Sequence, residues 1–148
     1  MTATDPTPPT GKRRGCGVYV LSDDGERVLL AQRGTGARHG HYKWEGPGGE
    51  AEDGETFEQA AIREVREELG VDVKLNDVAG EFEEFTDPNG QLWEAVIFTG
   101  HISEPPVIQE PTKCVGYGWF TKPEVKQLEQ ADCLVDYIVK DLQTIGWL

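Results

Sequence analysis

Residues 49–71 read GEAEDGETFEQAAIREVREELGV, and they crowd acidic side chains into one loop and the segment that follows it. Thr56 and Gln59 have the spacing of a capping box, and Gly70 stands where many helices end on glycine. These signals predict a helix over about residues 57–69. Because like charges one helical turn apart repel each other, we expect something positively charged to lie among these side chains.

Three carboxylates share one face of this helix. At 100° per residue, Glu64, Glu67 and Glu68 fall within an arc of about 100°. The neighbouring arc is apolar and is expected to be buried: it holds Ala61, Ile62, Val65 and Leu69. Carboxylates clustered at the edge of a core need a cation or basic groups among them. Oxygen ligands of this kind suit Mg²⁺ or Mn²⁺, which share the rest of their shell with water and substrate phosphates.

A second interpretation is a solvated helix whose charges pair at i,i+4, as Arg63 and Glu67 are spaced to do. It explains the charges, but it explains neither the Gly-rich loop ahead of them nor the bordering apolar stripe. Other sites fit less well. The loop lacks the ligand spacing of an EF-hand, and the chain has no P-loop. A zinc site at His39 and His41 would have only the distant His101 as a third imidazole.

The length and charge of the chain narrow its class further. A chain of 148 residues, 37% hydrophobic and 28% charged, is expected to form one folded domain. A net charge of −13 argues against nucleic-acid polymers as partners, since their binding needs surplus Lys and Arg. An anionic small molecule would need a metal ion or a local basic cluster to offset that charge.

The sequence also favours the cytoplasm. It has no apolar run of about 18 residues, so no membrane span is expected, and its N-terminus lacks the hydrophobic segment of a secretory signal. The cysteines are odd in number and show no C-x-x-C spacing, which indicates free thiols in a reducing compartment. They are Cys16, Cys114 and Cys133.

The order of predicted elements indicates a mixed α/β domain over residues 14–148, after a disordered tail over residues 1–13. CGVYVL and RVLLAQR, separated by turn residues, are expected to form a β-hairpin. VAGEFEEF and LWEAVIFTG, joined by a Pro-Asn-Gly turn, predict two further strands, and VGYGWF predicts a short one. The last helix is predicted from four apolar residues on one face: Leu134, Ile138, Leu142 and Ile145.

From Gly49 the chain reads Gly, five residues, Glu55, seven residues, and then REVREELGV over residues 63–71. This resembles the Nudix box, G-x5-E-x7-R-E-U-x-E-E-x-G-U with U aliphatic, and every fixed position is met. WEGPGGEAEDGET resembles the W-x-x-P-G-G entry of MutT-like members, and GWF before KPEVKQL resembles their late strand and following turn. The resemblance spans about residues 15–128.

The resemblance implies a Nudix α/β/α sandwich, with a mixed β-sheet between helices. It also implies an enzyme that hydrolyses a nucleoside diphosphate linked to another group, with Mg²⁺ or Mn²⁺ as cofactor. Carried over by position, Glu64, Glu67 and Glu68 are metal ligands, and the Gly48 carbonyl is a candidate for another contact. Glu55 and Arg63 would support the loop and helix, and the catalytic base would be Glu64 or Glu67.

The sequence departs from its relatives at two places. MutT-like members often carry a bulky residue where Gly46 stands, so a wider or looser site is expected there. QEPTKCVGYGWF resembles a stretch that often supplies another acidic ligand, but Val115 replaces its second acid. Glu110 would serve instead, or the site relies on the helix alone. The number of metal ions therefore stays open.

The short domain resembles nucleoside-triphosphate pyrophosphohydrolases, which implies an NTP or dNTP substrate, normal or oxidised. Arg33, Lys43 and Glu45 are candidate substrate contacts, with a solvated loop charge as the alternative for the two cations. The aromatic residues able to stack on a base, or to pack in the core, are Trp44, Trp93 and Tyr19. Dinucleoside polyphosphates, nucleotide sugars and a nucleotide sensor without turnover remain alternatives. The chain is expected to be a monomer or a homodimer.

Overall fold

The described strands lie between residues 12 and 120, with one long helix among them, and two short helices follow near the C-terminus. The computed structural model describes residues 11–78, 82–87 and 89–148. The strands are β1 (Lys12–Val20), β2 (Val28–Arg33), β3 (Trp44–Glu45), β4 (Gly48–Glu50), β5 (Val73–Val78), β6 (Glu83–Thr86), β7 (Leu92–Ile102) and β8 (Cys114–Phe120). The helices are α1 (Phe57–Leu69), α2 (Lys122–Gln130) and α3 (Asp136–Thr144).

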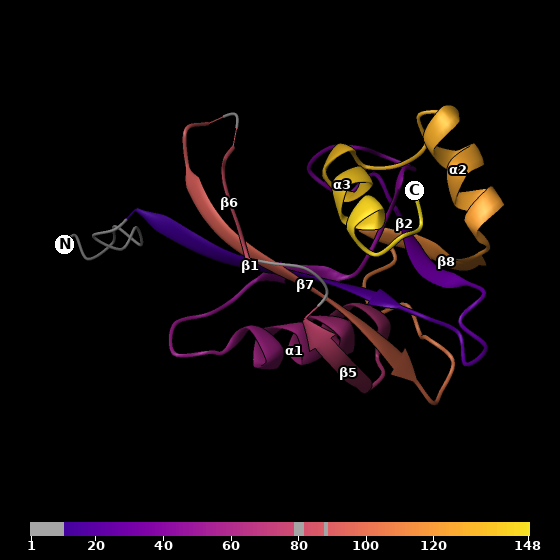
Figure 1. The fold of residues 1–148 in the computed structure, drawn as a ribbon, viewed down its shortest axis with the longest axis horizontal. Helices are drawn as coiled ribbons and strands as arrows, with labels where there is room; N and C mark the ends of the chain where they lie inside the picture. Colours follow the sequence, from indigo (N-terminus) through magenta and orange to yellow (C-terminus); the bar gives the residue numbers. More distant parts are fainter. Residues whose placement is uncertain (1–10, 79–81, 88) are drawn as a thin grey trace.

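Two sheets form the middle of the molecule. The larger has the order β4-β1-β7-β5, with β6 also paired to β7, and the smaller has the order β3-β2-β8. The β1–β7 pair is parallel and the remaining pairs are antiparallel, so the larger sheet is mixed. Helix α1 covers one side of this sheet, and α2 and α3 lie on the other side (Figure 1). The predicted α/β/α arrangement is confirmed.

Helix α1 has the predicted bounds, because local signals define both of its ends. The Thr56 hydroxyl accepts from the Gln59 N–H at 3.1 Å, and the Gln59 side chain accepts from the Thr56 N–H at 2.9 Å. Gly70 closes the helix with a φ of 66°, in the left-handed region that favours glycine. The predicted apolar stripe is buried, except that Ile62 is 40% exposed and belongs to the solvent face.

The core consists of two clusters on opposite sides of the larger sheet. One packs α1 against β1 and β7 around Val65, Val18 and Phe98. The other packs α2 and α3 against Tyr19 and the smaller sheet. Successive side chains of β2 contribute to different clusters, as the alternation of a strand requires. Both faces of the larger sheet are therefore covered, which fixes α1 in place beside β4.

The predicted hairpin of residues 16–21 and 27–33 is wrong. Strands β1 and β2 belong to different sheets, and a single bridge between Leu21 and Val28 joins them. Strand β1 instead runs parallel to β7, from Lys12 opposite Leu92 to Val20 opposite Gly100. This pairing spans a long stretch of chain, so no local turn signal indicates it.

Several boundaries also differ from prediction. Strand β1 begins at Lys12, so residues 12 and 13 belong to the sheet, whereas residues 1–10 lie outside the described residues. The predicted strand VAGEFEEF starts at the end of β5, which was not predicted; residues 79–81 lie outside the described part, and β6 begins at Glu83.

Near the C-terminus the differences concern helices. The stretch expected to be a turn is helix α2, whose Thr121 and Glu124 form a second capping box that does signal a helix. Helix α3 buries the predicted Ile138 and Leu142, but it begins after Leu134, which instead bridges to Trp44. No helix in the described ranges is both long and apolar enough to cross a membrane.

Replacing Thr56 with Ala is expected to lower the free energy of unfolding by about 1 kcal/mol, because the first turn of α1 loses its capping hydroxyl. Urea denaturation followed by circular dichroism measures this change. Thr35→Ala, which removes an exposed hydroxyl from a loop, is the control and should leave the midpoint unchanged. Equal midpoints for the two variants would contradict the capping role of Thr56.

Candidate functional site

The Arg63 guanidinium lies at the centre of the acidic stretch. It donates to both carboxylate oxygens of Glu55, at 2.8 and 3.0 Å. It also donates to Glu64 at 3.0 Å, to Glu67 at 3.0 Å and to the carbonyl of Glu50 at 3.0 Å. The expected positive charge is therefore present within the stretch itself. The i,i+4 pair between Arg63 and Glu67 is real as well, but it is one part of a larger network.

The same network ties the loop ahead of α1 to the helix. Glu55 is held by Arg63 and also accepts the backbone N–H of Glu52 at 2.9 Å. The Arg63 hydrogen bonds are the largest cause that lowers the pKa of Glu55 to about 2, and the Glu52 N–H contributes next. Glu55 is thus ionised at neutral pH, where it holds Arg63 and the loop.

Glu64 and Glu68 form a second group, next to Arg63 and partly withdrawn from water. Their carboxyl groups lie within hydrogen-bonding reach of each other. Burial raises the pKa of both side chains, and the neighbouring Glu64 charge raises that of Glu68 further. Two carboxyl groups in this state favour a shared proton or a cation between them.

Glycines at the start of β4 allow this close approach. A Cβ at Gly49 would lie 2.5 Å from a Glu64 oxygen, and one at Gly48 would lie 2.2 Å from the Cys16 carbonyl. The Gly48 N–H donates to Glu68 at 3.3 Å. The Gly48 backbone therefore lies beside one of the predicted ligands, and the two adjacent glycines let the strand pass directly against the acidic side chains.

The donor set suits a hard divalent cation. Among the described residues, no three His, Cys, Asp or Glu side chains already converge on one point. Glu64 and Glu68 nevertheless supply oxygen donors that are adjacent and short of water, while Glu67 is 53% exposed and pairs with Arg63. Holding these carboxylate oxygens together costs desolvation and repulsion. Binding of Mg²⁺ or Mn²⁺ between them would offset both costs.

A cavity of about 300 Å³ opens next to Glu64 and Glu68. Its charged lining brings together predicted and unpredicted residues: Arg33, Arg38, Glu45, Glu64, Glu68, Glu110 and Lys113. Sequence reasoning missed Arg38 and Lys113 as members of this group. Both belong to loops that come together only in the fold, so their positions in the sequence give no signal.

Arg33 and Glu45 form a partly buried pair in the cavity wall. Their side chains are 13% and 21% exposed, and Arg33 donates to Glu45 at 2.9 Å and to the His39 carbonyl at 2.8 Å. The Tyr137 hydroxyl, from α3, donates to the same Glu45 oxygen at 2.5 Å. Tyr137 was not predicted, because nothing in the sequence near residue 137 indicates that α3 reaches this wall.

The structure does not bring Lys43 into the cavity. Its ammonium group pairs with Asp132 at 3.1 Å, a contact that long-range folding creates. All three candidate stacking aromatics also belong elsewhere: Tyr19 is 1% exposed, and Trp44 packs edge-on against Phe120 with ring centroids 4.9 Å apart. Trp93 stacks with Phe85 and does not line the cavity.

The space at Gly46 is filled, so the expected wider site there is wrong. A Cβ at Gly46 would lie 2.7 Å from the Tyr19 ring and 3.0 Å from the Val18 carbonyl. The Tyr19 hydroxyl is fixed by a 2.7 Å hydrogen bond to Asp141 of α3. The space beside Gly46 is thus occupied by a ring that comes from β1.

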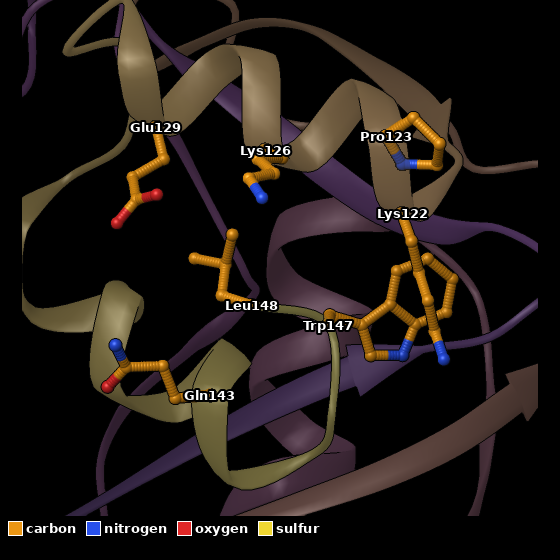
Figure 2. Close-up of a pocket in the computed structure, with 7 residues that line it drawn as sticks. All are labelled: Lys122, Pro123, Lys126, Glu129, Gln143, Trp147 and Leu148. Atoms are coloured by element: carbon orange, nitrogen blue, oxygen red, sulfur yellow. The ribbon is translucent and has the colours of Figure 1, made fainter.

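A second cavity, of about 410 Å³, lies between α2 and the last residues of the chain. Figure 2 shows Lys122 and Lys126 of α2 above Trp147 and Leu148, with Gln143 of α3 at one side. Among the described residues, it shares no lining residue with the cavity beside Glu64 and Glu68, here called the acidic cavity, and Glu129 is the one carboxylate side chain in its lining. The candidate site is therefore the acidic cavity, although it is the smaller of the two.

Comparison with known proteins agrees with this geometry. The NUDIX domain family model matches residues 11–139, so the chain belongs to the NUDIX domain family. A MutT NUDIX hydrolase from Burkholderia pseudomallei is 30% identical, with 76% of this chain and 85% of that chain covered and a TM-score of 0.66. A NUDIX hydrolase from Nitrosomonas europaea has a TM-score of 0.73 at 24% identity, with 90% and 87% covered, and supports the fold.

Two curated relatives carry the name 8-oxo-dGTP diphosphatase. The protein from Proteus vulgaris is 45% identical over 67 residues, which cover 43% of this chain and 59% of the relative. The protein from Escherichia coli K12 is 34% identical over 83 residues, which cover 55% of this chain and 64% of the relative. The matched segments span less than two thirds of either relative's length.

Replacing Glu55 with Gln is expected to lower the free energy of unfolding at neutral pH, because Arg63 loses its bidentate partner. Since the Glu55 pKa falls from 4.5 to about 2 on folding, the carboxylate's contribution is complete above about pH 4.5 and is lost as the pH falls toward 2. The stability difference between wild type and variant should therefore shrink on acidification, as measured by urea denaturation at several pH values.

Glu129→Gln removes an exposed carboxylate on α2 and is the control for that experiment. Its stability difference from wild type should be small at every pH. A Glu55→Gln difference that stays constant from neutral pH to pH 3 would contradict the assignment of Glu55 as the anion that holds Arg63.

Proposed function

We propose that this NUDIX domain hydrolyses a nucleoside triphosphate, ribo or deoxyribo and normal or oxidised, to a monophosphate and pyrophosphate. The observation that carries the proposal is the close pair of Glu64 and Glu68, which faces a cavity lined by three cationic side chains. Carboxylates that take divalent cations, beside arginines and a lysine, match the charge pattern of a metal-bound polyphosphate. The names of the two relatives support a nucleoside triphosphate as substrate.

Glu64, Glu67 and Glu68, with the Gly48 backbone, would hold Mg²⁺ or Mn²⁺. When bound, such an ion offsets phosphate charge and lowers the pKa of water. Glu64 and Glu68 are already adjacent, whereas Glu67 would contribute by exchanging its bond to Arg63. Arg63 would then remain anchored by Glu55, so that the loop keeps its position while the carboxylate moves.

Within the catalytic set, Glu67 is the better placed of the two candidate bases. Its side chain is 53% exposed, against 16% for Glu64, so a water molecule can reach it more readily. A base must reach a water molecule in line with the scissile bond and keep capacity to accept its proton. Glu64 would act mainly as a ligand, and Arg63 and Glu55 as the residues that position both.

Arg33 and Glu45 would contact the nucleotide from the cavity wall. Both hydrogen bonds received by Glu45 end on one oxygen, Oε1, and among the described residues no donor is found for Oε2. Because Glu45 lines the cavity, that second oxygen would serve as an acceptor for a donor group of the substrate. Lys43 is left out of the proposal, because its partner is Asp132.

Net charge and free cysteines bear on the partner of this domain and on the compartment in which it works. A net charge of −13 supports a small nucleotide over a nucleic-acid polymer as partner. The free thiols, Cys16 buried and Cys114 and Cys133 partly so, support a reducing compartment, which we take to be the cytoplasm. Monomer and homodimer both stay compatible with the chain.

The wild-type protein is expected to release pyrophosphate from nucleoside triphosphates in Mg²⁺, to lose this activity in a chelator and to regain it when Mg²⁺ or Mn²⁺ is added. Glu67→Gln should lower kcat by about 10²–10⁴-fold, because the variant cannot accept the proton from water. Its circular dichroism spectrum should match wild type, and Glu129→Gln should retain full activity.

The panel for this assay includes dinucleoside polyphosphates and nucleotide sugars, and kcat/KM across it ranks the substrates. If either of those classes has a higher kcat/KM than the nucleoside triphosphates, then that class is the substrate in place of the triphosphate. If the wild type hydrolyses no member with either metal, the enzyme proposal fails, and a domain that binds nucleotides without turnover is the reading that remains.

A further inference from the structure

The three cations of the acidic cavity differ in what already neutralises them. Arg33 is committed to Glu45 at 2.9 Å, and Lys113 pairs with Glu110 at 3.3 Å. Within residues 11–78, 82–87 and 89–148, the Arg38 side chain makes no ion pair and no hydrogen bond. Arg38 is therefore the cation of this cavity that can bind an anion without first giving up a partner.

Arg38 belongs to a loop that is fixed to the opposite wall of the cavity. The Gly34 and Gly36 N–H groups donate to the carbonyls of Lys113 and Thr112, each at 2.7 Å. A Cβ at Gly34 would lie 2.3 Å from the Thr112 carbonyl, and one at Gly36 would lie 2.8 Å from it. The two glycines thus permit a contact between backbones that holds the Arg38 loop at the cavity rim.

The loop is also braced from within. The His41 ring bonds to the carbonyl of Ala37 at 2.8 Å, and the Tyr42 N–H donates to the carbonyl of Arg33 at 2.8 Å. Arg38 follows Ala37 directly, and both line the cavity. The backbone that carries the free guanidinium is therefore anchored on both sides, while the side chain itself is exposed and able to turn toward a ligand.

We propose that Arg38 binds the terminal phosphate of the substrate and so makes the site select triphosphates over diphosphates. This inference rests on the proposed function. Glu64 and Glu68 repel any phosphate not neutralised by metal, so the end of the polyphosphate farthest from the scissile bond needs a cation of the protein's own. A guanidinium can donate two parallel N–H hydrogen bonds to the oxygens of one phosphate group. This geometry fits phosphate binding better than the role of a solvated surface charge.

The energetics favour Arg38 over its two neighbours for this role. Redirecting Arg33 would leave Glu45, which is 21% exposed, without its cation in a wall that is partly withdrawn from water. Redirecting Lys113 would separate it from Glu110, at a smaller cost, because both side chains are more than half exposed. Arg38 breaks nothing when it turns to phosphate, and in a chain of net charge −13 an uncommitted arginine at this rim attracts the anion specifically.

The test compares Arg38→Gln with Arg27→Gln, which removes the same charge from an exposed position between β1 and β2, outside both cavities. For each protein, KM and kcat are measured for a nucleoside triphosphate and for the matching diphosphate in Mg²⁺. Binding of a non-hydrolysable triphosphate analogue is measured by calorimetry as a readout that does not depend on turnover.

Arg38→Gln is expected to raise KM for the triphosphate about tenfold, the effect of one lost charge-assisted phosphate contact, and to weaken the analogue equally. The diphosphate KM and both kcat values should change less than about threefold, and Arg27→Gln should match wild type. Arg38→Lys should recover part of the loss, since it restores charge without the bidentate geometry.

The outcomes separate this inference from the proposed function. The role of Arg38 is overturned, and the hydrolase proposal stands, if the wild type turns over normally and Arg38→Gln behaves like Arg27→Gln. The same conclusion follows if Arg38→Gln raises KM equally for the triphosphate and the diphosphate. If the wild type hydrolyses nothing but binds the triphosphate analogue, and this binding depends on Arg38, then the phosphate contact stands and the proposed hydrolase activity is rejected. If wild type neither binds nor hydrolyses the triphosphate, both proposals fall.

Discussion

The contacts of Arg63 are the constraint on which the rest of the site depends. One guanidinium offsets the negative charges of three glutamates and also donates a hydrogen bond to the carbonyl of Glu50. It therefore joins the loop ahead of α1 to the face of the helix that carries Glu64 and Glu67. Without it, a helix with three carboxylates on one side would be weakened by their repulsion. With it, Glu55, Glu64 and Glu67 share one cationic partner, which offsets their mutual repulsion.

The second requirement is that the backbone of β4 comes close to the acidic side chains of α1. Helix α1 is packed on β1 and β7 through its apolar stripe, which places its acidic edge against β4. Glycines at the start of β4 leave no side chain between the strand and Glu64 or Glu68. The cavity then forms where this edge meets the smaller sheet: Arg33 ends β2, and Arg38 and Lys113 lie in loops next to that sheet. The carboxylates of α1 and these three cations therefore come from separate parts of the fold.

The sequence predicts what local chemistry determines and fails where distant segments meet. Helix α1 was predicted to the residue, because Thr56 and Gly70 define its ends within the chain's own backbone. The supposed hairpin fails, since β1 finds its partner in β7 by parallel pairing that no turn signals. For the same reason Lys43 was misjudged: its carboxylate partner, Asp132, is remote in sequence. Of the charged residues that line the cavity, Glu64, Glu68 and Arg33 were among the predicted site residues, while Arg38 and Lys113 were not.

The most direct test of the account is the crystal structure of the protein with Mn²⁺ and a non-hydrolysable nucleoside triphosphate, with the ion located by anomalous scattering. The account predicts a manganese peak bound by the carboxylates of Glu64 and Glu68, with Glu67 turned from Arg63 toward the ion. A structure at saturating Mn²⁺ with nucleotide bound, but with no ion near these side chains and Arg63 still bonded to Glu64 and Glu67, would contradict it.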